Sequence, residues 1–243
     1  MINKVVFKKI KFNNIDPSKF KKYITKNGLF VFPAGPALAS IKKSKIYYNS
    51  LLKADFVFFD SGFFVLLLKI FKNINVYKFS GYKFLSLFFN YIKKNKKKTI
   101  FSIDPNLNFS KSNKLYLKRL GIKKVDNYLA PKYNTKNLSD RKLLKLLKKT
   151  KPNFIIINIG GGIQEILGLY LKKNLKFKVS ILCTGGAISF FTGDQAPIND
   201  FIDKYFLGWL VRLFFNPIIF FNRYIFGLRL IPMVVFNEIK VKH

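Results

Sequence analysis

The chain has 243 residues, enough for one α/β domain with a substantial core, or for one domain with a small appendage. Its 49% hydrophobic content excludes a disordered protein, and its 17% aromatic content is high for a soluble one. The formal net charge of +34 favours a polyanionic partner: nucleic acid, an anionic bilayer face or a phosphorylated substrate. Because the excess is mostly Lys accompanied by much Phe, Ile, Asn and Tyr, an AT-rich genome explains the charge equally well.

The chain contains one cysteine, Cys183, and one histidine, His243. A single cysteine permits no intrachain disulfide and fits a reducing compartment. Zinc sites of the usual Cys/His kind and Ser-His or Cys-His triads are therefore excluded. The chemistry must depend on carboxylates, amides, hydroxyls, backbone groups and Lys or Arg, and no metal site is expected.

The beginning of the sequence has charges every few residues and no continuous apolar region, so we do not expect a secretory signal there. No stretch reaches 18 uncharged apolar residues. Phe56 to Leu68 comes closest, but Asp60 interrupts it. We therefore expect no membrane-spanning helix.

The first half contains two predicted strands and a helix. Asp55–Phe59 is a short apolar run that leads into Asp60, as in a buried strand with a polar loop at its carboxyl end. Residues 62–71 are predicted to be helical. Residues 98–103 form another candidate strand, which Asp104 closes.

A clearer helix follows. Ser139 or Asp140 can cap its beginning, and Pro152 ends it. Lysines lie opposite one apolar stripe, which consists of Leu143, Leu144, Leu146 and Leu147.

The next segment predicts a βαβ unit. Phe154–Ile159 is an apolar strand of the kind that is buried on both faces of a parallel sheet. The glycines 160–162 turn the chain into a helix over about 163–173, and Val179–Cys183 is the following strand. The pattern predicts an α/β fold with a Rossmann-like core and a mainly parallel sheet.

Composition changes near residue 200, which suggests a catalytic α/β domain over 1–200 and a helical, apolar and basic C-terminal appendage over 201–243. Residues 205–236 are strongly apolar, but arginines interrupt them too often for a membrane span. Helices lying in the bilayer interface fit this pattern, with Arg212, Arg223 and Arg229 at the headgroups. The alternative is a helical layer that covers the sheet or forms a dimer interface.

The glycine turn is a candidate phosphate site. Glycine-rich turns at the carboxyl ends of parallel strands are where α/β proteins bind ligands, and the following helix N-terminus favours negative charge. The candidate phosphate-binding residues are Gly160, Gly161 and Gly162, with a second turn at Thr184, Gly185 and Gly186. The alternative is that glycine is present only for the geometry of a tight turn. Gln164 and Glu165 follow in the first helical turn, where Glu165 either stabilises the helix dipole or, with Gln164, binds sugar hydroxyls or amides.

Asp60 is the candidate general base. It ends an apolar run, where a carboxylate is costly unless it is solvated or hydrogen-bonded. A partly desolvated carboxylate with a raised pKa suits deprotonation of a sugar hydroxyl. The alternative is a loop-capping turn to Gly62.

Several segments then match the motifs of one family, in order, over roughly residues 50–225. They are Ala54-Asp55…Asp60-Ser61-Gly62, Lys78-Phe-Ser80-Gly81, Pro152-Asn153…Gly160-Gly161-Gly162-Ile163-Gln164-Glu165, Gly185-Gly186…Ser189…Gly193…Ala196-Pro197 and Leu207-Gly208-Trp209…Arg212…Pro217…Arg223. The chain thereby resembles the WecG/TagA/CpsF glycosyltransferases of bacterial surface-polysaccharide and teichoic acid synthesis. Each match is modest alone, but together they are specific.

The resemblance implies a Rossmann-like core and an appendage that brings the enzyme to the membrane. It also implies transfer of a sugar, typically N-acetylmannosamine, from a UDP donor to an undecaprenyl-diphosphate-linked acceptor, with inversion and without an essential metal. The family's proposed base falls on Asp60, and its Gln-Glu pair falls on Gln164 and Glu165. Ser80 and Gly81 match a further motif loosely.

Some family residues are replaced. Pro33-Ala34-Gly35 stands where the family usually has Thr-x-Asn. Four polar residues of the other matched motifs are also replaced, by Lys83, Ser189, Gln195 and Gly208. These changes suggest a divergent branch with the same scaffold and a different sugar.

Sequence and resemblance together predict an inverting, metal-independent glycosyltransferase of surface-polysaccharide biosynthesis at the cytoplasmic face of the membrane. It would move an N-acetylhexosamine-like sugar from a UDP-sugar to a polyprenyl-diphosphate-linked acceptor and need no other cofactor. Whether it forms a homo-oligomer is left open. The alternatives are an inactive membrane-associated scaffold of the same pathway and a basic nucleic-acid-binding protein. Because the lysines are scattered and no RRM, helix-turn-helix or zinc-finger signature is present, no nucleic acid partner is expected.

Overall fold

The computed structural model describes residues 2–195 and 198–242, and in this part of the chain the strands form one nine-stranded sheet. The strand order is β6-β5-β7-β8-β3-β4-β2-β1-β9, parallel from β6 to β2, with β1 antiparallel to both of its neighbours. The strands are β1 (Lys4–Phe7), β2 (Ile10–Asn13), β3 (Gly28–Val31), β4 (Phe56–Val57), β5 (Ile100–Asp104), β6 (Val125–Leu129), β7 (Phe154–Ile157), β8 (Ser180–Cys183) and β9 (Ile239–Lys242). The predicted α/β fold with a mainly parallel sheet is confirmed.

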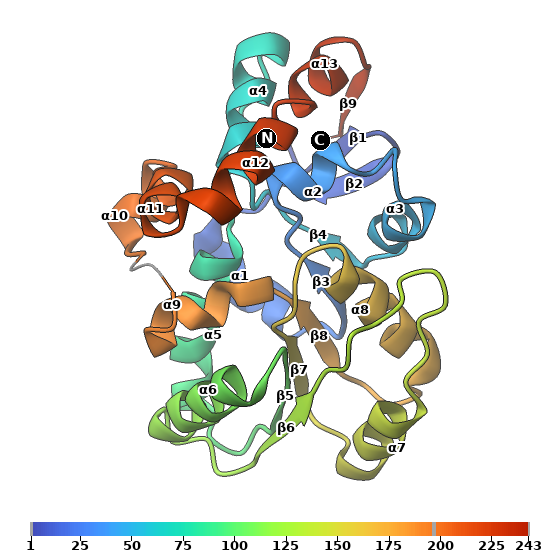
Figure 1. Cartoon of the computed structure of the whole chain (residues 1–243), viewed down its shortest axis with the longest axis vertical. Helices are drawn as coiled ribbons and strands as arrows, with labels where there is room; N and C mark the ends of the chain where they lie inside the picture. Colours follow the sequence, from blue (N-terminus) through green and yellow to red (C-terminus); the bar gives the residue numbers. More distant parts are fainter. Residues whose placement is uncertain (1, 196–197, 243) are drawn as a thin grey trace.

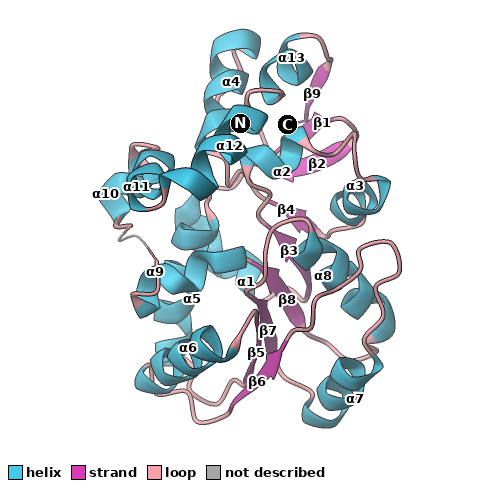
Figure 2. Cartoon of the chain, in the orientation of Figure 1, coloured by secondary structure: helices cyan, strands magenta, loops and turns pink. Residues whose placement is uncertain are grey.

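Helices cover both faces of the sheet, with α3, α7 and α8 on one side and α1, α5 and α6 on the other (Figures 1 and 2). The α-helices are α1 (Phe20–Ile24), α2 (Gly35–Ala39), α3 (Lys45–Leu52), α4 (Gly62–Lys72), α5 (Gly81–Lys94), α6 (Leu107–Arg119), α7 (Arg141–Thr150), α8 (Ile163–Asn174), α9 (Ser189–Thr192), α10 (Asp200–Lys204), α11 (Gly208–Phe215), α12 (Pro217–Gly227) and α13 (Leu230–Val235). Two short 3-10 turns are η1 (Pro17–Lys19) and η2 (Gly185–Ile188).

The apolar strands bury alternate residues in two cores, one on each face of the sheet. In β7, Ile155 and Ile157 belong to one core, whereas Phe154 and Ile156 belong to the other. Side chains alternate across a strand, so a continuous apolar run needs helices on both faces. This packing explains why the predicted βαβ unit forms as expected, with β7 parallel to β8 and α8 between them in sequence.

The start of α7 confirms one of the two predicted caps. Asp140 is the N-cap, and its carboxylate accepts a hydrogen bond from the backbone N–H of Leu143 at 2.8 Å. The hydroxyls of Tyr128 and Tyr133 donate to the same carboxylate. The helix ends before Lys151, whose left-handed φ of 44° turns the chain toward the next strand.

Two strands end earlier than predicted, and both differences concern the site. β7 ends at Ile157, so Asn158 and Ile159 belong to the loop that follows it. β4 contains only Phe56–Val57, because the chain turns where the N–H of Asp60 donates to the carbonyl of Phe58. Asp60 therefore lies beyond the end of the strand.

The C-terminal segment has two different surroundings. In α13, Leu230, Met233 and Val234 are buried in the main core, and β9 extends the sheet beside β1. By contrast, no residue of α11 is buried. No helix within the described residues is long and apolar enough to cross a membrane. The predicted boundary at residue 200 remains a prediction.

Candidate active site

A cavity of about 560 Å³ lies at the carboxyl ends of the parallel strands, between the loops that follow β4, β7 and β8 and the helices α11 and α12. Most of the predicted site residues line it: Asp60, Ser80, Gly160, Gly161, Gln164, Glu165, Thr184, Gly185, Gly186, Arg212 and Arg223. Gly81, Gly162 and Arg229 do not belong to the lining. The sequence-predicted residues thus come together from five separate stretches of the chain.

Asp60 is partly buried at the wall of this cavity. One of its carboxylate oxygens accepts a hydrogen bond from the backbone N–H of Gly81 at 2.8 Å. Burial raises the pKa of Asp60, although this hydrogen bond and the charges of Arg212 and Lys78 oppose the rise. A carboxylate with a raised pKa in a cavity is suited to accept a proton.

Gln164 and Glu165 are both buried, and their side chains hold the two glycine turns together. Glu165 accepts the backbone N–H of Gly162 at 2.6 Å and a hydrogen bond from the Gln164 amide at 3.0 Å. The amide oxygen of Gln164 accepts the N–H of Gly185 at 2.6 Å. Burial, reinforced by the charge of Asp60, raises the pKa of Glu165 to about 7.

The glycines of the turn after β7 differ in their surroundings. Gly162 adopts a φ of +92°, which favours glycine for backbone geometry, and its N–H is bonded to Glu165. A Cβ built on any of the three glycines would meet nothing within 4 Å, but only Gly160 and Gly161 line the cavity. The backbone at Gly160 and Gly161 therefore borders open space in the cavity, whereas the amides of Gly162 and Gly185 are bonded within the protein.

Two arginines from the C-terminal helices line the opposite side of the cavity. The Arg212 guanidinium lies over the Phe190 ring at 5.0 Å from its centroid. Neither Arg212 nor Arg223 forms an ion pair with a carboxylate among the described residues. Arg229 lies elsewhere and stacks over Phe226 at 4.7 Å. Arg212 and Arg223 leave positive charge available for an anionic ligand.

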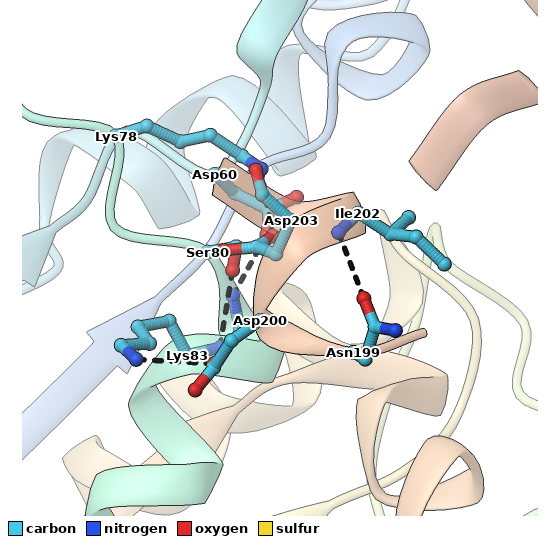
Figure 3. A network of polar contacts seen from close by, with 9 residues as sticks. Asp60, Lys78, Ser80, Lys83, Asn199, Asp200, Ile202 and Asp203 are labelled. Carbon is cyan, nitrogen blue, oxygen red and sulfur yellow. Dashed lines mark hydrogen bonds and ion pairs between the residues drawn. The ribbon is translucent and has the colours of Figure 1, made fainter. Parts of the chain in front are cut away.

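Helix α10 is tied to the loop and helix that carry Ser80 (Figure 3). The Lys78 ammonium contacts the carboxylate of Asp203 at 2.6 Å, and both side chains are about 85% buried, with exposures of 13% and 15%. A second, more exposed pair joins Lys83 to Asp200 at 3.0 Å. These contacts attach the beginning of the C-terminal segment to the cavity wall, which the sequence analysis did not anticipate.

Phe206 lines the cavity beyond α10. It has a left-handed φ of 62°, and the Lys78 ammonium lies 5.2 Å from its ring centroid. A Cβ on Gly62 would approach the Phe206 ring to 2.5 Å. Glycine at position 62 thus permits close packing of the C-terminal segment, beyond the turn geometry considered from the sequence.

The sequence analysis also missed part of the cavity lining. Aromatic side chains contribute to it, namely Tyr82, Phe190, Trp209, Phe220 and Tyr224. Asn158 lines it too, and the signal was visible: Asn158 is the one polar residue inside the apolar run 154–159.

The replaced family positions have different surroundings. Gln195 and Gly208 line the cavity, whereas Lys83 pairs with Asp200 and Ser189 is buried at the start of α9. The matched Ala196 and Pro197 lie outside the described residues. Two of the four replacements therefore border the space for a ligand.

Comparison with known proteins agrees with the resemblance seen in the motifs. Residues 5–243 match the "Glycosyl transferase WecG/TagA/CpsF family", which is nearly the whole chain. No curated protein matches the sequence. The cavity with its aspartate, its glycine turns and its arginines is thus carried by a protein that belongs to the WecG/TagA/CpsF family of glycosyltransferases.

Proposed function

We propose that the protein transfers a sugar, N-acetylhexosamine-like, from a UDP-sugar to a polyprenyl-diphosphate-linked acceptor in surface-polysaccharide biosynthesis. Membership of the family supports the glycosyltransferase activity. One observation carries the proposal further: the same cavity is lined by Asp60, a carboxylate with a raised pKa, and by Arg212 and Arg223, which pair with no carboxylate in the described part of the chain. Transfer from a nucleoside diphosphate needs both a base and compensation of the leaving group's charge.

In the proposed reaction, Asp60 takes the proton of the acceptor hydroxyl. The acceptor oxygen then forms a bond to the anomeric carbon, from the side opposite the nucleotide. The bond between that carbon and the phosphate oxygen breaks, and UDP leaves with the electron pair. A single displacement of this kind inverts the anomeric configuration.

Arg212 and Arg223 would offset the charge that develops on the diphosphate, together with the backbone at Gly160 and Gly161. Guanidinium groups stay protonated and match phosphate geometry. With two such groups available, we propose that the reaction needs no metal ion.

We propose that α11 and α12 lie in the cytoplasmic face of the membrane. Large apolar side chains are exposed on these two helices, with exposed fractions of 80% for Phe214 and 85% for Ile218. An apolar helix surface beside arginines suits the bilayer interface. The same helices line the cavity, so a lipid-linked acceptor would reach Asp60 from the membrane side.

The test is a panel of UDP-sugars incubated with the full chain and a polyprenyl-diphosphate-sugar acceptor, with UDP release as the readout. We expect transfer from one donor, unchanged by EDTA, with an inverted anomeric product. Full activity of Asp60→Asn would rule out Asp60 as the base. Loss of transfer with EDTA, restored by a divalent ion, would rule out the metal-independent mechanism.

A further inference from the structure

A buried polar cluster surrounds Asp104 at the carboxyl end of β5. The Asp104 carboxylate is fully buried and accepts four side-chain hydrogen bonds, from Ser102 at 2.8 Å, Asn113 at 2.7 Å, Asn127 at 2.8 Å and Asn158 at 2.8 Å. It forms no ion pair among the described residues. Four neutral donors, one on β5 itself and three on neighbouring elements, therefore hold one buried charge in place.

This cluster fixes the orientation of the Asn158 amide. Its nitrogen donates to Asp104 and, at 2.9 Å, to the hydroxyl oxygen of Ser102, whose own hydrogen points at Asp104. A carboxylate only accepts hydrogen bonds, so the nitrogen of Asn158 must face it. The amide oxygen of Asn158 is left without a partner in the described part of the chain.

Asn158 lines the cavity, whereas Ser102 and Asp104 do not. Its side chain is 6% exposed, so its free oxygen is an acceptor in a nearly closed environment. An unpaired buried acceptor is unfavourable on its own. A ligand N–H or O–H in the cavity would satisfy it.

Thr184 provides a second free polar group beside the first. Its hydroxyl oxygen has no partner among the described residues, it is 7% exposed, and it lines the same cavity. The last paired residues of β7 and β8 are Ile156 and Leu182, so Asn158 and Thr184 each lie two residues beyond this pair, at the start of the loops that follow two neighbouring strands. Because neighbouring strands are about 4.8 Å apart, the two loops begin side by side, one with an acceptor and the other with a hydroxyl that can donate.

We propose that Asn158 and Thr184 recognise the nucleobase of the donor as a uracil. The Asn158 oxygen accepts the imide N3–H, and the Thr184 hydroxyl donates to an adjacent carbonyl of the base. Asp104 is a positioning residue, because it acts only through Asn158. This inference rests on the proposed transfer from a UDP-sugar and names the residues that select the nucleotide.

The position of Asn158 along the sheet favours the base over the sugar. Asn158 follows β7, and Asp60 follows β4, which is three strands away in the sheet order. A sugar's acetamido group lies one bond from the carbon next to the anomeric centre, so it would stay near Asp60. The base lies at the far end of the donor, beyond the diphosphate and the ribose.

The hydrogen-bond pattern discriminates between pyrimidines. Uracil has a donor at N3, whereas cytosine has an acceptor there, which would face the acceptor of Asn158. A site built around a hydrogen bond rejects analogues that leave its buried group unpaired.

The probes are UDP, 3-methyl-UDP, which lacks the N3–H, and 2′-deoxy-UDP, which lacks a ribose hydroxyl. We measure their dissociation constants for the full chain by calorimetry. For the wild type, we expect 3-methyl-UDP to bind at least about tenfold more weakly than UDP, as one lost buried hydrogen bond implies. In Asn158→Ala this ratio falls to within about twofold, since the group that distinguishes the two ligands is gone.

Three further variants separate recognition from folding. Asp104→Asn lowers the ratio between UDP and 3-methyl-UDP because it frees the Asn158 amide to turn. Asn127→Ala removes another hydrogen bond to Asp104 outside the cavity and keeps the ratio. Thr184→Val keeps the side-chain volume, and it lowers the affinity for UDP and for 3-methyl-UDP by the same factor.

The outcomes are distinct. Equal binding of UDP and 3-methyl-UDP by the wild type overturns the inference without any variant. An Asn158→Ala variant that keeps the ratio between UDP and 3-methyl-UDP overturns it too. The inference also fails if Asn158→Ala abolishes a difference in affinity between UDP and 2′-deoxy-UDP, because Asn158 would then bind the ribose. If the wild type transfers sugar from a UDP donor but shows these results, only the inference fails. If it binds no UDP at all, the proposed function fails with it.

Discussion

The carboxylate of Asp60 accepts the backbone N–H of Gly81 at 2.8 Å, so the first residue of α5 fixes the position of the residue that follows β4. Ser80, the N-cap of that helix, accepts the N–H of Lys83 and holds the helix start in place. Asp60 is thus oriented by backbone geometry, and a substitution there tests chemistry more than folding.

The substitution Asp60→Asn should lower kcat by a factor on the order of 100 to 10,000, the usual contribution of a general base. Because burial disfavours the charged carboxylate, the variant should be as stable as the wild type or more stable. Thermal melts and initial rates measured on the same preparation check both expectations. An inactive variant that also melts much earlier would instead assign Asp60 a structural role.

The rate should depend on pH through Asp60. A base works when it is deprotonated, and burial raises the pKa of Asp60 above its ordinary value of 3.8. The acid limb of kcat/KM should therefore lie at higher pH than an unperturbed aspartate would give. Arg212→Gln removes a charge that lowers this pKa, so it should move the limb to still higher pH. An unmoved limb would contradict the assignment.

Glu165 should make folding stability depend on pH. Its folded-state pKa of about 7 lies above its ordinary value of 4.5, so the folded state binds the proton more tightly. The free energy of unfolding should fall as pH rises from about 4.5 to about 7, by at most about 3 kcal/mol. Urea melts of the wild type and of Glu165→Gln check this, since the variant should lack that slope. Identical slopes would exclude Glu165 as the source.

The two ion pairs of α10 should contribute differently to stability. Asp203→Asn weakens the largely buried contact with Lys78 and should cost about 1–3 kcal/mol of local stability, with faster hydrogen exchange in residues 198–207. Asp200→Asn, in the exposed pair with Lys83, is the matched control and should cost less than about 1 kcal/mol. If residues 198–207 were equally protected from hydrogen exchange in the two variants, the contact between Lys78 and Asp203 would not be what holds α10 in place.

Exposed apolar residues of the C-terminal helices should govern membrane association. Phe214→Ser combined with Ile218→Ser should reduce co-flotation with anionic vesicles at least severalfold, because each removes exposed apolar surface. Leu115→Ser, at a 52% exposed position on α6, is the control and should float like the wild type. If all three proteins float equally, α11 and α12 are not the membrane contact.

The sequence determined the mainly parallel α/β arrangement and four of its strands, β4, β5, β7 and β8, because continuous apolar runs such as 154–157 can only be satisfied between two helical layers. It also predicted Asp60 and the glycine turn as site residues, because Asp60 ends an apolar run and the glycines follow a strand, and the structure places Asp60, Gly160 and Gly161 at the cavity wall. These are local signals, and a single sequence displays them.

Only the tertiary structure decided which groups remain available to a ligand. Gly162 and Gly185 looked like phosphate donors, but their N–H groups are bonded to Glu165 and Gln164. Asn158 lay inside a predicted apolar strand, yet within the described residues a cluster around Asp104 leaves its oxygen free. Hydrogen bonds between residues far apart in sequence leave no local pattern, so the division between bonded and free groups appears only when the chain is folded.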